Sequence, residues 1–245
     1  DLQTEIRNIE KNEADALIKG AIIYLTEGYK EPKVSDWIAS LEKDILENIQ
    51  LFKLAATNPE ALAESFPLDP FRAYDVNILL DNAGIKDSPV IIETAPSLST
   101  LFGNIERVSD RKGNFYADFL NIKAGSMLRA NGGFLVLRVS HLFEAPGVWK
   151  TLKRILTYMM LDIQDNHIYY QMAPSSLKPE SIPIDLKVIL IGNSYIYSFL
   201  AEREDDFKKI FKVKAEFDYE ISRSKETLVQ YAHIIKKIIS DENLK

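Results

Sequence analysis

Four acidic residues stand next to short apolar runs, where carboxylates could act as general acids and bases: Asp81, Glu93, Asp118 and Asp185. Acid–base catalysis needs such groups within hydrogen-bond reach of one substrate. The spacing of these four along the chain brings no two of them together predictably. We therefore interpret them as solvated strand ends and turns and expect no catalytic residue among them.

Motifs that hold phosphates or activate nucleophiles are missing. The chain has no Gly-x-x-x-x-Gly-Lys-Ser/Thr loop, and its Gly132-Gly133 pair precedes an apolar run, which is the wrong order for a dinucleotide turn. It has no Gly-x-Ser-x-Gly elbow, and zero cysteines exclude a thiol nucleophile. The histidines are scattered, at His141, His167 and His233. We expect no enzyme site contained wholly within these residues, and no metal site.

The first part of the chain has helical periodicity. Apolar residues recur at steps of three and four over residues 34–52, after the Glu31-Pro32 pair, with Ser35 or Asp36 as the expected N-cap. A looser version of the same pattern precedes Gly28. Residues 1–56 therefore predict an antiparallel helical arm. Residues 57–73, which hold three prolines, predict a linker.

The pattern of residue types changes after the three prolines. Short runs rich in β-branched residues predict buried strands, with a helix over 147–160 between two of them. These strands are expected at residues 76–80, 90–93, 134–137 and 186–191. Two hairpins are expected, at 105–119 and at 161–172. The pattern predicts an α/β core over 74–222 with a mostly parallel sheet, and a helix over 225–240 that begins a further domain within 223–245.

Composition excludes several classes of protein. The net charge of −6 disfavours a nucleic-acid partner, because neutralising phosphates needs a basic face. No apolar run reaches the roughly 18 residues of a membrane span. The absence of cysteine is consistent with a cytoplasmic origin. The chain begins at Asp1 without an initiator Met or a signal-peptide pattern, so we expect part of a longer protein.

From about residue 74 to 239 the sequence resembles the AAA+ region of Lon-like proteases, particularly the B-type and C-type branches. Five strings in the family's order carry the resemblance: LFGNIE at 101–106, AGSMLRANGGFLVL at 124–137, WKTLKR at 149–154, IPIDLKVILIGN at 182–193 and DFKKIFKV at 206–213. The helices before Pro59 resemble the arm that such proteins carry. The resemblance implies an AAA+-like sheet with flanking helices, without its phosphate-binding loop.

The resemblance also implies roles for particular residues. Residues 134–137 match the Walker B strand, whose tip normally carries an Asp for Mg²⁺ and a Glu for the attacking water. Here Arg138 and Val139 take those places, and neither can perform the task. Asn193 matches the sensor asparagine, and Lys208 or Lys209 falls at the arginine-finger position. This combination predicts a degenerate nucleotide site, with no cofactor expected here although the family uses ATP and Mg²⁺.

The family supplies expectations for partners as well. The first predicted hairpin lies where relatives place an aromatic pore loop, and its candidates are Phe115, Tyr116, Phe119 and Leu120; a buried strand face is the equal alternative. The parent protein is expected to be a hexameric Ser-Lys endopeptidase that binds unfolded polypeptides and has its dyad beyond Lys245. Two alternatives remain: a polypeptide-binding scaffold without a protease, and an active ATPase whose Walker A motif lies upstream of Asp1.

Overall fold

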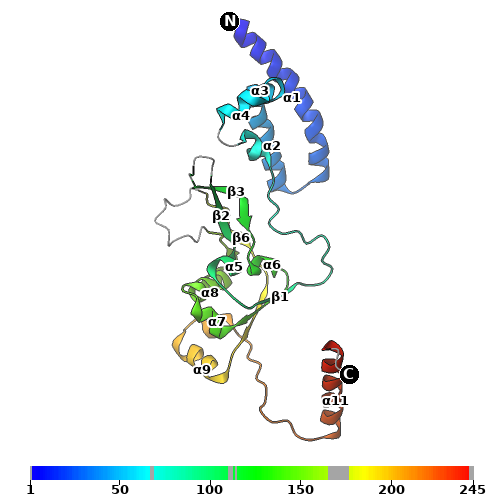
Figure 1. Ribbon diagram of the computed structural model, residues 1–245, viewed down its shortest axis with the longest axis vertical. Helices are drawn as coiled ribbons and strands as arrows, with labels where there is room; N and C mark the ends of the chain where they lie inside the picture. The colour runs from blue at the N-terminus through cyan, green and yellow to red at the C-terminus, as the bar shows by residue number, and fades with distance from the viewer. Residues whose placement is uncertain (1, 67–68, 110–112, 114, 165–176, 243–245) are drawn as a thin grey trace. The chain divides into compact units, whose positions relative to one another are not determined.

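The computed structural model describes residues 2–66, 69–109, 113, 115–164 and 177–242. These residues form an α/β fold with a three-stranded parallel sheet flanked by helices, which confirms the predicted fold class (Figure 1). The chain divides into two compact units, residues 1–192 and 193–245. Within the described residues, no helix is both long and apolar enough to cross a membrane.

The chain begins with four helices. α1 (Leu2–Gly28) is followed after three residues by α2 (Pro32–Glu47), which runs back along it; α3 (Ile49–Thr57) and α4 (Pro59–Ser65) complete the arm (Figure 1). Ile22 and Ile38 are buried in this arm. The Lys53 ammonium of α3 lies 2.5 Å from the Glu10 carboxylate of α1. Packing of these apolar faces holds the arm together, as expected for helices of this length.

Two details of the predicted arm were wrong. The expected continuous helix over 34–52 is interrupted at Asn48, whose side chain donates hydrogen bonds to the carbonyl and the carboxylate of Asp44. The N-cap of α2 is Glu31, since Pro32 occupies the first helical position and its fixed φ suits that place. The Ser35 hydroxyl instead donates to the Glu31 carbonyl inside the helix.

The proline-rich segment contains helical turns. Pro59 starts α4 and Pro70 starts the 3₁₀ helix η1 (Pro70–Tyr74). Each is preceded by a side-chain cap, because the Asn58 and Asp69 oxygens accept from Ala61 N and Phe71 N. Prolines read from sequence as breakers therefore mark helix starts, where a missing N–H costs nothing.

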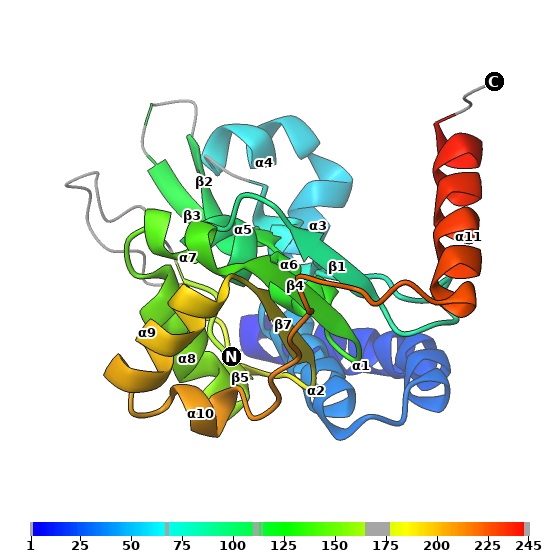
Figure 2. The same cartoon turned by 90° about the horizontal axis from the view of Figure 1, so that it is seen from below.

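The sheet has the strand order β1-β4-β7, all parallel (Figure 2). Its strands are β1 (Val90–Glu93), β4 (Phe134–Arg138) and β7 (Lys187–Ile191), which agree with three of the predicted runs. The fourth predicted strand, at 76–80, was wrong. That segment forms no strand. Its anchor is the Asn77 side chain, which donates hydrogen bonds to the carbonyls of Phe119 and Ile122, and not backbone pairing with a neighbouring strand.

The two faces of this sheet differ. Leu135 and Leu137 of β4 are fully buried, and four helices belong to the same part of the chain. These are α5 (Leu98–Phe102), α6 (Ser126–Arg129), α7 (Val139–Glu144) and α8 (Val148–Tyr158). On the other face Ile92 and Ile191 are 69% and 52% exposed. Parallel sheets are normally covered on both faces and are therefore apolar on both. This second face has that apolar character although its side chains are exposed.

The first predicted hairpin is confirmed. β2 (Asn104–Ser109) pairs antiparallel with β3 (Phe115–Lys123), with an irregularity in register between Ile105 and Arg107. The second predicted hairpin, over 161–172, lies partly outside the described residues. There β5 (Met160–Leu161) pairs instead with β6 (Ile182–Pro183).

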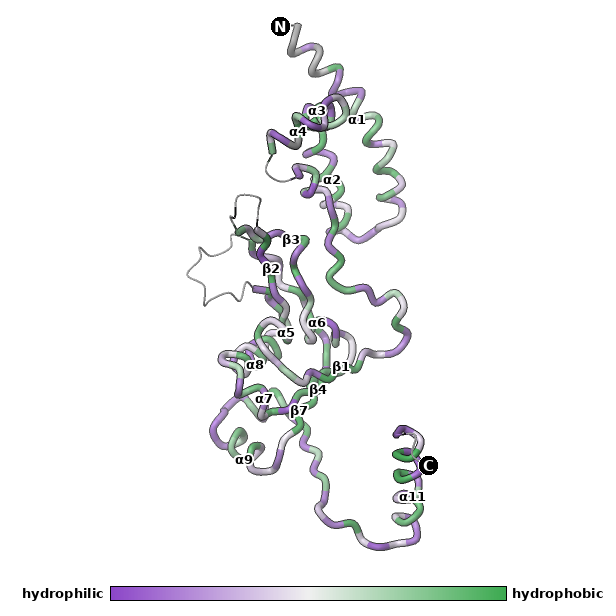
Figure 3. The backbone as a smooth tube through the Cα atoms, in the orientation of Figure 1, coloured by the Kyte–Doolittle hydropathy of each residue, from purple (hydrophilic) through white to green (hydrophobic). Residues whose placement is uncertain are grey.

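The second unit contains α9 (Ser194–Arg203), α10 (Phe207–Ile210) and α11 (Lys225–Asp241). The Ser224 side chain and Thr227 form a capping box that starts α11, so the helix predicted over 225–240 is confirmed. Apolar residues recur along α11 (Figure 3), and Leu228, Ile235 and Ile238 are exposed there.

An aromatic cluster joins η1 to the arm and contains a tyrosine whose pKa is raised. The Phe52 ring lies 5.0 Å from Phe71 and 5.5 Å from Tyr74, and the Tyr74 hydroxyl donates to the Asp44 carboxylate at 2.7 Å. Burial, aided by the Asp44 carboxylate, raises the pKa of Tyr74 to about 12 from an ordinary value of 10.0. The folded chain therefore holds the phenolic proton more strongly than the unfolded chain does.

This stabilisation is complete below pH 10.0 and is lost as the pH rises towards about 12. We expect Tyr74→Phe to be less stable than the wild type at pH 9, and the gap to narrow by pH 11. The urea midpoints of the wild type and Tyr74→Phe at pH 9 and pH 11 measure this difference in stability. Tyr24→Phe, at an exposed tyrosine of α1, is the control and should show no such change. A gap that widens with pH would contradict the burial of the hydroxyl.

Candidate functional site

The candidate site lies where β4 ends. Arg138 is the last residue of β4, is exposed, and pairs in register with Ile191 of β7. Because the carboxyl ends of parallel strands share one edge, residues that follow β1, β4 and β7 come to the same side of the sheet. The sequence placed Arg138 at this tip, and the structure puts its side chain in solvent.

Val139 is turned into the protein. It is the first residue of α7, and its side chain is only 4% exposed. A Cβ built on Gly192, just after β7, would lie 3.5 Å from the Val139 Cγ2 atom. Val139 therefore fills space between α7 and the end of β7, and its hydrocarbon can neither orient water nor accept a proton.

The end of β1 carries a polar network. The Ser126 hydroxyl, fully buried at the start of α6, hydrogen-bonds to the Glu93 carboxylate and lies 3.1 Å from the Thr100 carbonyl. The Arg129 guanidinium donates to the Ser126 hydroxyl at 2.9 Å. The other Glu93 oxygen accepts from Ala95 N at 3.1 Å. Glu93 thus ties β1 to α6 and to the segment after β1.

The other sequence candidates for carboxylate chemistry have separate partners. The Asp81 carboxylate accepts from Ala83 N within a turn, and the Asp118 carboxylate pairs with Arg72. The Asp185 backbone binds the Asn131 side chain and Gly132 N beside the start of β4. The structure brings no pair of these four residues into one hydrogen-bonded group. Asp81 and Asp185 are exposed, as expected, but the interpretation as solvated strand ends and turns was wrong for Glu93 and Asp118, whose side chains are only 14% and 10% exposed.

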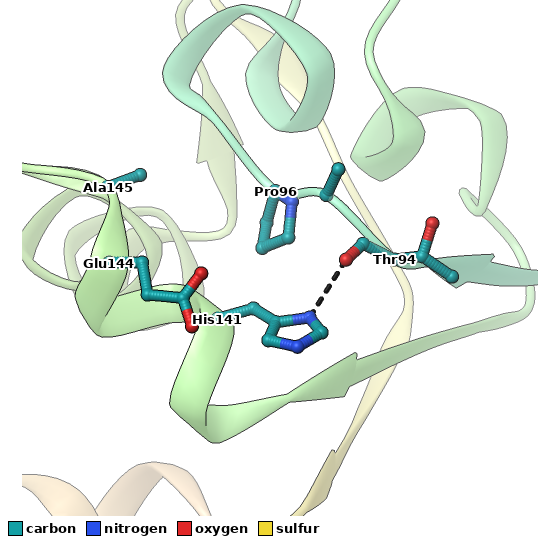
Figure 4. A pocket seen from close by; sticks show the side chains of 6 residues that line it. Thr94, Pro96, His141, Glu144 and Ala145 are labelled. Atoms are coloured by element: carbon teal, nitrogen blue, oxygen red, sulfur yellow. Dashed lines mark hydrogen bonds between the residues drawn. The ribbon is translucent and has the colours of Figure 1, made fainter.

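A small pocket opens beside β1 and α7. It has a volume of about 280 Å³ and is lined by Thr94, Ala95, Pro96, His141, Glu144 and Ala145. Figure 4 shows the His141 ring pointing from α7 to the Thr94 carbonyl, which lies 2.8 Å from its Nδ1. A carbonyl can only accept, so Nδ1 carries the proton. Sequence reasoning missed this pocket, because His141 has no other histidine nearby in the chain.

Asn193, the sensor-like residue, is the N-cap of α9. Its side-chain oxygen accepts from Ile196 N at 2.8 Å. Asparagine is among the best N-cap residues because it satisfies a helix-end donor. This cap explains an asparagine here without any ligand, and the sensor role stays a prediction.

The two lysines at the arginine-finger position lie in the short helix α10. Phe207 anchors that helix, as it is buried and its ring lies 5.8 Å from Tyr197 and 5.3 Å from Phe211. Lys208 is exposed, and the Lys209 ammonium lies 3.3 Å from the Asp206 carboxylate. Their finger role also stays a prediction.

The four pore-loop candidates differ in exposure. Phe115 is 54% exposed and pairs with Ser109 at the far end of the hairpin. Tyr116, Phe119 and Leu120 are half-buried. Residues 110–112 and 114 lie outside the described part of the chain. Among the four candidates, only Phe115 presents a largely exposed ring.

A family model gives the decisive comparison. Residues 86–218, more than half of the chain, match the family described as "LonB-like, AAA domain". The chain belongs to this family. The match confirms the Lon-like AAA+ resemblance, and it covers β1 to β7 together with α9 and α10 of this LonB-like AAA domain.

Individual proteins are similar over shorter stretches. A Haemophilus influenzae protein (strain ATCC 51907 / DSM 11121 / KW20 / Rd) described as "Putative Lon protease homolog" is 29% identical over 129 residues, which are 51% of this chain and 20% of that protein. This chain therefore spans about a fifth of that relative's length.

Two solved structures of NtrX from Brucella abortus are also similar in part. The one in complex with ADP has a TM-score of 0.42 at 17% identity, covering 64% of this chain and 32% of NtrX. The other has a TM-score of 0.34 at 18% identity, covering 51% and 26%.

Proposed function

We propose that this LonB-like AAA domain is the substrate-gating part of a Lon-like protease subunit, with a nucleotide site that has lost its hydrolytic residues. The proposed subunit forms a homo-oligomeric, hexameric ring in the cytoplasm. It passes unfolded polypeptides to a Ser-Lys protease domain outside this chain. Neither peptidase nor ATPase activity is assigned to the residues present.

The tip of β4 carries the proposal. Magnesium in nucleotide sites is held by oxygen ligands, and the attacking water is oriented by a hydrogen-bond acceptor. Arg138 offers a cation at the first position, and Val139 offers a buried hydrocarbon at the second. Val139 is only 4% exposed, so the hydrocarbon at this position belongs to the buried part of the fold and not to its surface.

The exposed apolar face of the sheet supports the view that further polypeptide completes this domain. Its exposed residues, Val90, Ile92, Phe134, Ile189 and Ile191, alternate along all three strands. Burying such side chains contributes about 25 cal/mol for each Å² removed from water. A sheet of this kind gains stability when a further element covers it.

The arm supplies a surface for polypeptide capture. Leu17 and Tyr24 of α1 are 78% and 79% exposed, and Tyr29 and Trp37 are exposed nearby in the chain. Large apolar side chains at the surface favour contacts with unfolded segments, since aromatic residues bury much area at low entropy cost. In this proposal, the arm binds polypeptide before it reaches the ring.

The proposal is tested on the full-length protein with Mg²⁺-ATP. We expect ATP turnover below about 0.01 per second, far under the ordinary enzyme range, and β-casein cleavage that does not depend on nucleotide. Arg138→Ala should leave both rates unchanged. Rapid Mg²⁺-dependent ATP turnover would favour the active-ATPase alternative, whose Walker A lies upstream of Asp1. Absence of peptidase activity would favour the non-enzymatic scaffold.

A further inference from the structure

The 3₁₀ helix η1 contacts both the helical arm and the β2–β3 hairpin, which carries the pore-loop candidates. It has five residues, starts at Pro70 with an Asp69 cap, and lies in the chain between the arm and the sheet. In a 3₁₀ helix, residues three apart lie on the same side. Phe71 and Tyr74 therefore share one side, and Arg72 points about a third of a turn away from them.

On its first side η1 binds the arm. Phe71 and Tyr74 pack on Phe52 of α3, with ring centroids 5.0 Å and 5.5 Å apart. The Tyr74 hydroxyl adds a hydrogen bond of 2.7 Å to Asp44 of α2. Three rings and one charged acceptor thus fix η1 to two helices of the arm.

On its second side η1 binds the β2–β3 hairpin. The Arg72 guanidinium lies 2.5 Å from the Asp118 carboxylate; the Asp118 side chain is 10% exposed and that of Arg72 is 34% exposed. The other Asp118 oxygen accepts from Leu120 N at 3.0 Å. Three residues after η1, the Asn77 amide donates to the Phe119 and Ile122 carbonyls at 2.8 Å and 3.1 Å.

We propose that η1 is a mechanical joint that couples the position of the helical arm to that of the β2–β3 hairpin. The joint transmits displacement because a proline-started turn cannot absorb it by changing φ at Pro70, and because its two sides hold different elements. The coupling gives the proposed function a route by which polypeptide bound to the arm repositions Phe115 on the hairpin. The role of this coupling in substrate handling rests on the proposed function, whereas the contacts of η1 with the arm and the hairpin are present without substrate.

Hydrogen exchange of the full-length protein, read on peptides covering residues 49–57 and 115–123, tests the joint. Phe52→Ala removes the ring between α3 and η1. We expect exchange of the 115–123 peptide to quicken about tenfold, because the Leu120 amide depends on Asp118 and so on Arg72. Leu54→Ala is the matched control, since Leu54 is half-buried on the same helix but lies outside the ring cluster. It should change the 115–123 peptide less than about twofold.

A second variant keeps the test decisive if Phe52→Ala unfolds the arm. Tyr74→Phe removes only the hydroxyl that binds Asp44, and we expect about threefold faster exchange in the 115–123 peptide. The joint is refuted if α3 exchanges faster while the hairpin stays at the wild-type rate. Equal effects of Phe52→Ala and Leu54→Ala would also refute it, as they would reflect general loosening.

Adding β-casein separates the joint from polypeptide capture. If both hold, casein slows exchange in α1 and in the 115–123 peptide of the wild type, but in Phe52→Ala it slows only α1. If casein protects neither, capture by the arm is wrong, and the variant comparison without casein still decides the joint. If the wild type gains protection in α1 alone, the joint does not transmit binding and the proposal fails.

Discussion

Gly125→Ala is expected to lower the free energy of unfolding by about 3 kcal/mol, because the added methyl group has no space. A Cβ on Gly125 would lie 2.4 Å from Gly103 N and 2.5 Å from the Leu101 carbonyl oxygen. These are backbone atoms of the α5 end, so no side-chain rotation relieves the overlap. Gly125 has φ −85°, a value open to alanine, and the whole cost is therefore steric.

Thermal and urea unfolding of the variant measure this cost. At about 3 °C per kcal/mol for a protein of this size, the Tm should fall by roughly 9 °C. Gly20→Ala is the matched control: Gly20 lies inside α1 with nothing within 4 Å of its Cβ position. Alanine there should stabilise the helix by about 1 kcal/mol. Wild-type stability of Gly125→Ala would show that α5 and α6 do not meet at the base of the hairpin.

Val139→Glu is expected to destabilise the fold by about 3 kcal/mol or more, because it places a carboxylate in an apolar site. Val139 is 4% exposed and lies against Gly192. In an intact Walker B motif the glutamate faces the nucleotide site, where a carboxylate has partners. The expected loss therefore distinguishes a filled, degenerate position from an open one.

Ser140→Glu is the control for charge and position. Ser140 is exposed, one residue further along α7, near the helix N-terminus, where a carboxylate is favourable. Its free energy of unfolding should stay within about 0.5 kcal/mol of the wild type. Urea unfolding of both variants at pH 7 gives the comparison. If Val139→Glu is as stable as Ser140→Glu, position 139 opens to solvent and is not a filled, degenerate position.

The same packing bears on attempts to restore hydrolysis. Arg138→Asp changes an exposed side chain at a strand end, so the fold should accept it. Under the proposed function Val139 must also become acidic before water can be oriented, and that change places a carboxylate at a position that is only 4% exposed. If the proposed degenerate site is correct, restoring the acidic residue at position 139 therefore requires repacking as well as substitution.

Local patterns predicted the elements that depend on neighbouring residues. The helical spacing in the first 56 residues, the β-branched runs at 90–93, 134–137 and 186–191, and the paired strands of the first hairpin all have counterparts in the structure. The run at 76–80 failed because an extended, side-chain-anchored segment has the same composition as a strand. Pro59 and Pro70 were interpreted as part of a linker, but each starts a helix, because a proline can end one element and start another equally well.

Contacts between distant residues could not be predicted in this way. Nothing near Asp118 in sequence indicates Arg72 as its partner, and nothing near Phe52 indicates Phe71 and Tyr74. The close approach of Gly103 and Gly125 likewise joins residues on either side of a whole hairpin. Such pairs depend on how elements pack, which a single sequence does not encode in any local period.

The sequence by itself determined the α/β class, the Lon-like AAA+ relationship and the presence of Arg138 and Val139 at the end of the 134–137 run, because these follow from residue identity and order. Only the tertiary structure decided that Val139 is buried, that Asn193 caps α9, and that apolar side chains such as Ile92 and Ile191 are exposed on one sheet face. Burial depends on which elements cover a residue, and a hydrogen bond depends on where two backbones meet. Both quantities exist only once the chain has folded.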